Sequence, residues 1–183
     1  MKKWMIKVPG STSNLGPGFD SIGLAVNRYL TIEAAPSDDW TFIYHTPGYD
    51  QLPSNEDNLM YKVIEYTARE LGKPLPAIKC RLNIHCDLPL ARGLGSSAAA
   101  IVAGIELAGA LLDVPLTKKE KARLASLYEG HADNVAASVY GGLIVASHSE
   151  EETTVVPCGL PNMDMVAMIP PRELETAQSR SVL

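Results

Sequence analysis

The pattern of hydrophobic and polar residues in the first half of the chain predicts several strands and one helix. Four segments are predicted to be β-strands: residues 2–8, 29–35, 40–45 and 78–86. Residues 78–86 are the clearest case, because apolar and polar residues alternate there as on a half-buried strand. Residues 54–74 instead repeat apolar residues at helical spacing, and Gly72 and Pro74 end the predicted helix.

The second half contains a predicted helix of unusual composition. Residues 97–112 carry a single charged residue, Glu106, so this helix is expected to be buried on nearly all sides. Thr117 and Glu120 form a capping-box pattern, which predicts the start of the next helix. Two further strands are predicted, near 142–147 and at 163–169.

A long stretch rich in glycine and polar residues, residues 10–23, is predicted to be a loop. Strands and helices otherwise follow one another without strict alternation, and the sequence contains no internal repeat. This order favours an α+β fold over a doubly wound parallel sheet.

The composition and charge of the chain indicate a soluble globular protein that binds neither nucleic acid nor membranes. The 183 residues are 46% hydrophobic and 20% charged, which is ordinary for a soluble globular protein. The net charge of −5 argues against binding to nucleic acid or to an anionic membrane. No apolar run has the length of a signal-peptide core or of a transmembrane helix.

Cys80 and Cys86 would lie about 20 Å apart on one predicted strand and could not pair, so a reducing, cytoplasmic compartment is expected.

One short stretch carries candidate chemistry: PLARGLGSSAAA, residues 89–100. Ser96 and Ser97 fall at the predicted start of the apolar helix, where backbone N–H groups lack partners within the helix and the helix dipole is positive. Gly93 and Gly95 allow the backbone to approach a ligand closely. The hydroxyl groups can donate to phosphate oxygens or bind Mg²⁺, so the stretch predicts a phosphate site. It is not a Walker A loop, because no Lys-Ser/Thr pair follows the glycines, and the structural alternative is a tight turn followed by a serine cap.

The same stretch carries a resemblance to a known family. Residues 89–99 resemble the phosphate-binding motif of the GHMP kinases, the group that includes galactokinases, homoserine kinases and mevalonate kinases. Two other stretches, VPGSTSNLGPGFDSIGLAV at residues 8–26 and EGHADNVAASVYGG at residues 129–142, resemble motifs of the homoserine kinases. Motif order and spacing match that family along residues 4–183.

The resemblance implies the GHMP kinase fold, which is α+β. Residues 1–157 would form the ATP-binding domain, similar to domain 2 of ribosomal protein S5, and residues 158–183 would begin a truncated, ferredoxin-like C-terminal domain. The family's glycine-rich third motif and its second arginine for the substrate carboxylate are absent, and the sequence stops within a helix predicted from Arg172. These features predict that the chain is part of a longer protein.

The resemblance also implies an activity, the ATP-dependent phosphorylation of the L-homoserine hydroxyl to O-phospho-L-homoserine in threonine biosynthesis. The ATP phosphates would lie along Pro89, Leu90, Ala91, Arg92, Gly93, Leu94, Gly95, Ser96, Ser97, Ala98 and Ala99. Ser97 would face the β- and γ-phosphates as a catalytic residue, and Ser97 with Glu129 would bind Mg²⁺, which prefers hard oxygen ligands. The implied partners are ATP, L-homoserine and a second copy in a homodimer, with neither nucleic acid nor membrane.

Homoserine presents an ammonium, a carboxylate and a reacting hydroxyl. The resemblance places Asn14, Asp20 and Asn134 at the amino acid, and Asp20 suits the ammonium by charge. Arg180 would hold the carboxylate through a bidentate bond, and Thr176 would lie near the reacting hydroxyl beside Asn134.

Each of these residues has a structural alternative. Asn14 and Asp20 could be turn residues. Asn134 could be a helix cap, Arg180 a surface charge and Glu129 a solvated carboxylate at a helix end.

No general base is expected. Asn134 stands where mevalonate-kinase-like members have an aspartate, and an amide does not accept a proton usefully at neutral pH. Asp133 would point about 100° away from Asn134 around a helix. The histidines at 85, 131 and 148 suggest no alternative base by their positions.

Two other functions remain open from the sequence. Another GHMP enzyme, such as a mevalonate or diphosphocytidyl-methylerythritol kinase, is disfavoured by Asn134 and by the NLGPGFD stretch. A non-catalytic nucleotide-binding or interaction module could also keep the phosphate loop. The S5-type fold occurs in ribosomal proteins too, but the net charge of −5 disfavours RNA binding.

Overall fold

The computed structural model describes residues 2–167 and 169, which form a mixed β-sheet and four helices. The elements are β1 (Trp4–Asn14), β2 (Gly18–Ser37), β3 (Thr41–Tyr44), α1 (Leu59–Glu70), β4 (Lys79–Cys86), α2 (Ser96–Leu112), α3 (Lys118–Glu129), α4 (Asp133–Tyr140), β5 (Leu143–His148) and β6 (Thr153–Gly159). The strand order is β3-β4-β2-β5-β6, with β1 paired to β2. The predicted α+β class is confirmed.

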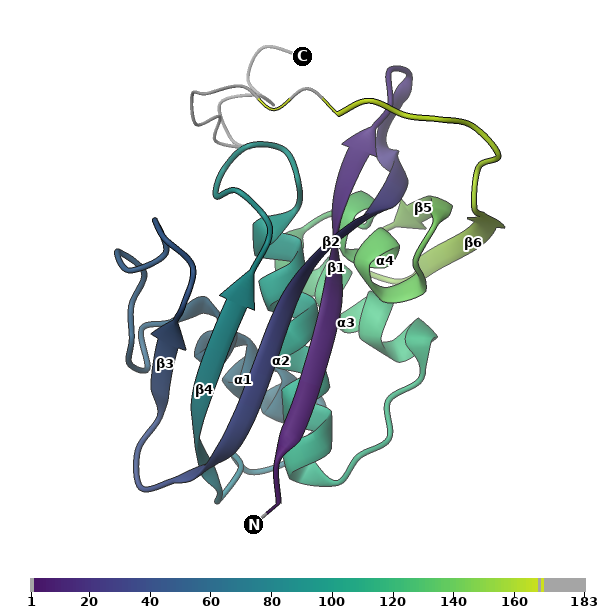
Figure 1. The fold of residues 1–183 in the computed structure, drawn as a ribbon. Coiled ribbons are helices and arrows are strands. Elements are labelled where there is room, and N and C mark those ends of the chain that lie inside the picture. The colour runs from purple at the N-terminus through teal and green to yellow at the C-terminus, as the bar shows by residue number, and fades with distance from the viewer. Residues whose placement is uncertain (1, 168, 170–183) are drawn as a thin grey trace.

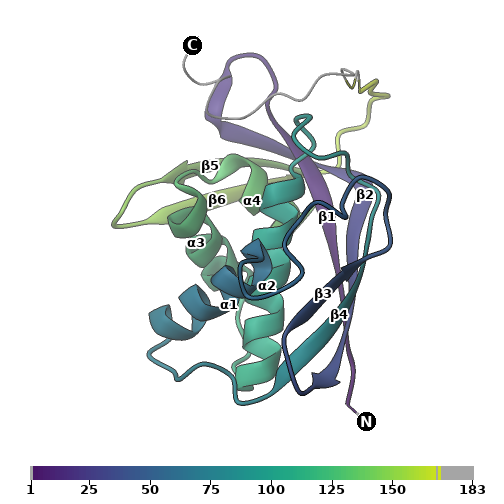
Figure 2. The same cartoon turned by 90° about the vertical axis from the view of Figure 1, so that its left-hand side faces the viewer.

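The long strand β2 organises the sheet. Strand β1 pairs with β2 in antiparallel fashion, residues 30–37 of β2 pair with β4, and residues 22–24 pair with β5. The helices α1–α4 cover one face of this sheet (Figures 1 and 2), and both α2 and α4 contact β1. The sheet thereby brings the start of α2 and the start of α4 to the same strand.

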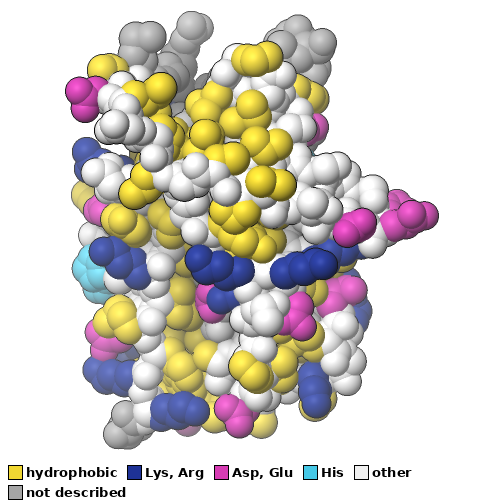
Figure 3. Space-filling model, turned by 90° about the vertical axis from the view of Figure 1, so that its right-hand side faces the viewer, with side chains coloured by type: hydrophobic (Ala, Val, Ile, Leu, Met, Phe, Trp, Pro, Cys, Tyr) yellow, Lys and Arg dark blue, Asp and Glu magenta, His cyan; other side chains and the backbone are white. Residues whose placement is uncertain are grey.

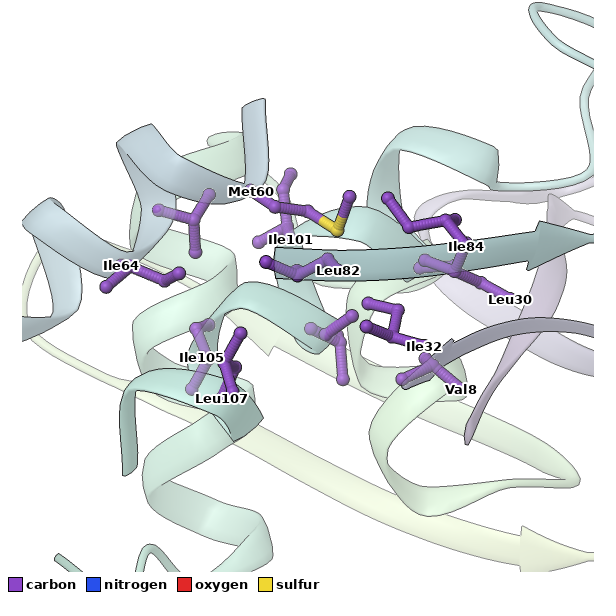
Figure 4. Packing of buried hydrophobic residues seen from close by; sticks show 14 of the residues in the cluster. Val8, Leu30, Ile32, Met60, Ile64, Leu82, Ile84, Ile101, Ile105 and Leu107 are labelled. Atoms are coloured by element: carbon purple, nitrogen blue, oxygen red, sulfur yellow. The ribbon is translucent and has the colours of Figure 1, made fainter. Parts of the chain in front are cut away.

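The core lies between the sheet and the helices (Figure 4). Ile32 of β2, Leu82 of β4 and Ile101 of α2 belong to one buried cluster, so the predicted burial of α2 is confirmed. Close packing of α2 on α1 needs Gly104, because a Cβ there would lie 2.8 Å from Cγ1 of Val63.

The predicted loop at residues 10–23 is wrong. Strand β1 continues to Asn14 and β2 begins at Gly18, so the two strands form a hairpin. Its backbone groups pair across the strands, with Ser11 opposite Ala25. The serine, threonine and glycine residues of this hairpin lack the apolar alternation of a strand, and only the cross-strand pairing reveals it.

The predicted strand at residues 163–169 is also wrong, because residues 163–167 and 169 are not in a strand. The last described strand is instead β6, at Thr153–Gly159, which pairs with β5 and was not predicted. A strand needs a neighbour for its backbone hydrogen bonds, and β5 supplies that neighbour to β6. The proposed domain boundary at residues 157–158 lies inside β6 and stays a prediction, while the helix predicted from Arg172 lies outside the described residues.

The predicted strands at residues 40–45, 78–86 and 142–147 and the predicted helices at residues 54–74 and 97–112 are confirmed to within a few residues, whereas β1 and β2 extend well beyond the predicted 2–8 and 29–35 because they form the hairpin. Thr117 and Glu120 form the predicted capping box, in which the Glu120 backbone N–H donates to Oγ1 of Thr117 at 3.2 Å. Cys80 and Cys86, which were predicted not to pair with each other, are free thiols, and so is Cys158. Among the described residues, no helix combines the length and the apolar character needed to cross a membrane.

Gly23 on β2 lies directly against the start of α4. A Cβ on Gly23 would collide with the backbone oxygen of Asp133. A backbone atom cannot move aside as a flexible side chain can, so Gly23→Ala should lower the free energy of unfolding by about 3 kcal/mol. Denaturant unfolding measures this loss, and Asn27→Ala, at an exposed position of the same strand, should change the free energy by less than about 0.5 kcal/mol. A Gly23→Ala protein as stable as its parent would contradict this packing.

One side of the molecule exposes hydrophobic side chains. In Figure 3 they gather in the upper part of the view, above a row of lysine and arginine side chains. Exposed hydrophobic residues of β5, β6 and the segment that follows include Val145, Val156 and Leu160. Clustered apolar surface of this kind is typical of faces that pack against another domain or another chain.

Candidate active site

The phosphate loop predicted from the sequence joins β4 to α2. The helix starts at Ser96, as predicted, and its N-cap is Gly95, with φ 65° and ψ 34° in the left-handed region. No described side chain makes a cap hydrogen bond at this end of α2. The structural alternative of a serine cap is therefore wrong, because Ser96 and Ser97 lie within the first helical turn.

Gly95 is required by two independent features. Its left-handed backbone favours glycine, and a Cβ on it would collide with Oγ of Ser11 and lie 2.8 Å from the Ser11 backbone oxygen. The Ser11 backbone N–H also donates to the Leu94 carbonyl at 3.1 Å. Strand β1 is thereby held directly against the phosphate loop.

A cavity of about 810 Å³ opens at this end of α2. The predicted site residues that line it are Asn14, Leu90, Ala91, Arg92, Gly93, Gly95, Ser96, Ser97, Ala98, Glu129 and Asn134. Pro89 and Leu94 line a neighbouring cavity instead, and Ala99 is buried in the core. The structure thus brings most of the predicted nucleotide, metal and substrate residues together, while Thr176 and Arg180 lie outside the described residues.

The cavity also has an apolar wall. It is formed mainly by Leu30, Tyr44, Tyr49, Leu52, Leu59 and Met60. The hydroxyl of Tyr49 is buried and donates to the Leu88 carbonyl at 2.6 Å, which holds this ring in place. A surface of aliphatic and aromatic side chains suits a flat, weakly polar group of a ligand.

Glu129 is the last residue of α3 and faces the cavity. Its side chain is only 21% exposed, which contradicts the alternative of a fully solvated carboxylate. Nε2 of His131 lies 3.9 Å from Oε1 of Glu129. Glu129 and Ser97 therefore present a carboxylate and a hydroxyl to one cavity, and both are ligand types that suit Mg²⁺.

His131 and Asp133 form a buried pair beside Glu129. Nδ1 of His131 lies 2.6 Å from Oδ1 of Asp133, and the Asn134 backbone N–H donates to the same oxygen at 2.8 Å. Burial by itself would raise the pKa of Asp133, but hydrogen bonds from His131, Ser13 and the Asn134 N–H hold it below its usual value. Asp133 is therefore ionised at neutral pH.

Asp20 joins this pair from the hairpin. Its side-chain oxygen and the ligand atoms of His131 and Asp133 all lie within 4.8 Å of one another. The Asp20 backbone N–H donates to Oδ1 of Asn14 at 3.0 Å, so the Asn14 side chain links the two strands of the hairpin. Two carboxylates and an imidazole so close together create a site that attracts a cation.

Asn134 is held from two sides. The helix cap of α4 is Ala132, so the alternative of a cap role for Asn134 is wrong. Oγ of Ser11 lies 3.0 Å from Oδ1 of Asn134, and Nδ2 of Asn134 donates to Oγ of Ser13 at 2.9 Å. The amide of Asn134 is therefore fixed against β1 at the wall of the cavity.

Four residues of the site were not predicted: Ser11, Ser13, His131 and Asp133. All four lie in the two stretches that resemble homoserine kinase motifs, so those motifs were the available signal. The composition of residues 10–23 predicts a loop, and only the pairing of β1 with β2 brings Ser11 and Ser13 to the site. The sequence predicts that Asp133 points away from Asn134, but its carboxylate oxygen bonds both His131 and the Asn134 backbone N–H, so Asp133 belongs to the site.

Comparisons with known proteins add sequence and structural relatives. Residues 58–142 match the family described as the GHMP kinases N terminal domain. A homoserine kinase of Halalkalibacterium halodurans is 51% identical over 180 residues, which cover 98% of this chain and 58% of the relative. A homoserine kinase of Shouchella clausii is 53% identical over 178 residues, which cover 97% of this chain and 59% of the relative. The chain thus spans less than two thirds of the length of these relatives.

Solved structures of two kinases are similar in fold to this chain. The crystal structure of a homoserine kinase from Cytophaga hutchinsonii superposes with a TM-score of 0.74 at 28% identity and covers 99% of this chain and 60% of that one. A mevalonate kinase from Methanococcus jannaschii superposes with a TM-score of 0.64 at 18% identity, covering 84% of this chain and 55% of that one, which shows a shared fold.

Proposed function

The chain belongs to the GHMP kinase family, and from this premise we propose that the protein is a homoserine kinase that transfers the γ-phosphate of ATP to the hydroxyl of L-homoserine. The product would be O-phospho-L-homoserine, an intermediate of threonine biosynthesis. The observation that carries the proposal is the single cavity where the phosphate loop, Glu129 and the amides of Asn14 and Asn134 meet.

ATP would bind with its phosphates at the start of α2. The first N–H groups of this helix and the hydroxyls of Ser96 and Ser97 can donate to phosphate oxygens, and the helix dipole favours negative charge there. The apolar wall with Tyr44 and Met60 suits the flat base of the nucleotide.

Ser97 and Glu129 fit Mg²⁺ by their chemistry, since one offers a hydroxyl and the other a carboxylate at the same cavity. When bound, Mg²⁺ would offset the charge of the phosphate groups during transfer. The protein's own contribution would be to hold the phosphates and to place the acceptor hydroxyl in line with them.

The amino acid would bind where the hairpin meets α4. Asp20, next to ionised Asp133, would attract its ammonium group, and Asn14 and Asn134 would bind its polar groups. Thr176 and Arg180 are proposed at the hydroxyl and the carboxylate from the resemblance alone. Asp133 is a poor general base because its pKa is lowered and its carboxylate already accepts hydrogen bonds from His131 and the Asn134 N–H, so the γ-phosphate is the proposed proton acceptor.

A substrate comparison tests the proposed function. The full-length protein is assayed for ADP release from ATP and Mg²⁺ with L-homoserine or with mevalonate. Turnover is expected with L-homoserine, whereas turnover with mevalonate would favour another GHMP kinase. Tight binding of ATP without turnover of either compound would instead favour a non-catalytic nucleotide-binding module.

Ser97 provides a first test of individual roles. Ser97→Ala in the full-length protein should lower kcat about tenfold or more, because one positioned hydroxyl is lost from the phosphate and metal site. Steady-state kinetics measures the change, and Thr154→Ala, at an exposed position of β6, serves as the control. A parental kcat in Ser97→Ala would show that the Ser97 hydroxyl is not needed at the phosphate and metal site.

We further propose that the protein is a cytoplasmic homodimer that binds neither nucleic acid nor membranes, as the resemblance implies. The exposed hydrophobic residues on one side of the molecule are compatible with association. Light scattering during size-exclusion chromatography of the full-length protein should give twice the mass of one chain.

A further inference from the structure

We propose that Ser11 and Ser13 are positioning residues which, anchored by Asp133, fix the direction of the Asn134 side-chain amide, with its oxygen toward Ser11 and its nitrogen toward Ser13. The inference deepens the proposed function and rests on it, because Asn134 is a proposed substrate residue. The relevant observation is a continuous chain of hydrogen bonds between β1 and the start of α4.

Asp133 anchors this chain of hydrogen bonds. Its side chain is 2% exposed, and it accepts hydrogen bonds from His131 and from the Asn134 backbone N–H. A hydrogen bond from Ser13 is a further cause of the lowered pKa of Asp133. An ionised carboxylate can only accept hydrogen bonds. In the proposed arrangement, the single hydroxyl hydrogen of Ser13 is directed at this carboxylate.

The direction of the Ser13 hydroxyl decides how Ser13 bonds to Asn134. Since Ser13 has no second hydrogen to donate, its oxygen can only accept from Asn134, which lies 2.9 Å away. The amide oxygen and nitrogen have nearly the same shape, so the hydrogen-bond partners decide which of them faces Ser13. The nitrogen must lie on the Ser13 side.

The oxygen of the amide then faces Ser11. Oγ of Ser11 lies 3.0 Å from both Oδ1 and the backbone oxygen of Asn134, so Ser11 is the donor to Asn134. Oγ of Ser138 lies 3.3 Å from Oγ of Ser11 and supplies a hydrogen in turn. Ser11 is fully buried and Ser138 is 4% exposed, so bulk water does not compete for these bonds.

This direction has a chemical consequence for the acceptor hydroxyl of a bound substrate. The amide oxygen of Asn134 lies on the side of Ser11, which contacts the phosphate loop through Leu94 and Gly95. A substrate hydroxyl that donates its hydrogen to this oxygen keeps its lone pairs for attack on phosphorus. The reversed amide would instead donate to the hydroxyl oxygen and occupy a lone pair that the transfer needs.

Position 13 is suited to the test, because Ser13 is half-buried and lines the cavity, whereas Ser11 is packed against Gly95. Ser13→Ala in the full-length protein should lower kcat between about tenfold and a hundredfold, with the KM for ATP unchanged. Ser13→Thr keeps a hydroxyl and should recover most of this loss. Ser147→Ala, at an exposed position of β5, is the matched control and should retain parental kcat.

A readout independent of activity accompanies the kinetics. In ¹⁵N-labelled protein, the side-chain NH₂ signals of Asn134 are assigned by their loss in Asn134→Ala. One proton signal should move to higher field in Ser13→Ala and return in Ser13→Thr, with thermal unfolding confirming that each variant is folded. An unmoved amide signal or parental kcat in Ser13→Ala would overturn the inference. The Asn134 signal could also move in Ser13→Ala while the parent protein fails to phosphorylate homoserine. This result would support the hydrogen bond from Asn134 to Ser13 and refute the proposed function instead.

Discussion

Glu129→Gln in the full-length protein should lower kcat about a hundredfold at moderate Mg²⁺ concentration. The substitution keeps the size of the side chain and its hydrogen bonding capacity but removes the negative charge that faces the cavity beside Ser97. A divalent ion held by one carboxylate and one hydroxyl loses its only protein charge in this variant, so a higher Mg²⁺ concentration should recover part of the activity.

The measurement is kcat as a function of Mg²⁺ concentration at saturating ATP. Glu151→Gln, in the exposed turn between β5 and β6, is the control. It removes a negative charge from a residue that does not line the cavity and should leave kcat and its Mg²⁺ dependence unchanged. If Glu129→Gln shows the parental Mg²⁺ dependence, Glu129 is not a metal ligand and its partly buried carboxylate serves another purpose.

Asp20→Asn should raise the KM for homoserine at least about thirtyfold and leave the KM for ATP nearly unchanged. Loss of one partner from a desolvated charge pair costs about 2–5 kcal/mol, and 2 kcal/mol corresponds to about a thirtyfold change in affinity. Asparagine keeps the backbone N–H that donates to Asn14, so the hairpin should stay intact while the charge beside His131 and Asp133 changes.

Initial-rate kinetics with each substrate varied in turn separates the two constants. Asp39→Asn, which removes an exposed carboxylate paired with Lys79 at 3.2 Å, is the matched control. If the two KM values rise together, or if neither rises, Asp20 has only a structural role in the hairpin.

Much of the fold could be predicted from local patterns in the sequence. The alternation of residues 78–86 predicted β4, the helical spacing in residues 54–74 predicted α1, and the Thr117 capping box predicted the start of α3. Such patterns work because a strand or helix that packs on one face must place its apolar residues with the period of its own backbone. The glycines before α2 and the serines of its first turn led in the same way to the prediction of a phosphate loop, since left-handed backbone and a ligand-accessible helix start both depend on residues that are close in sequence.

Other features depend on pairs of residues that are distant in sequence, and local patterns carry no information about them. Strand β6 and the hairpin of β1 and β2 exist because a neighbouring strand completes their backbone hydrogen bonds. Ser11 and Asn134, which are separated by 123 positions, meet only because β1, the phosphate loop and α4 pack together through Gly23 and Gly95. The sequence by itself was enough to propose which side chains bind phosphate, metal and amino acid. The tertiary structure decided which of these side chains share a cavity and which contacts hold the Asn134 amide, because both depend on residues that are distant in sequence.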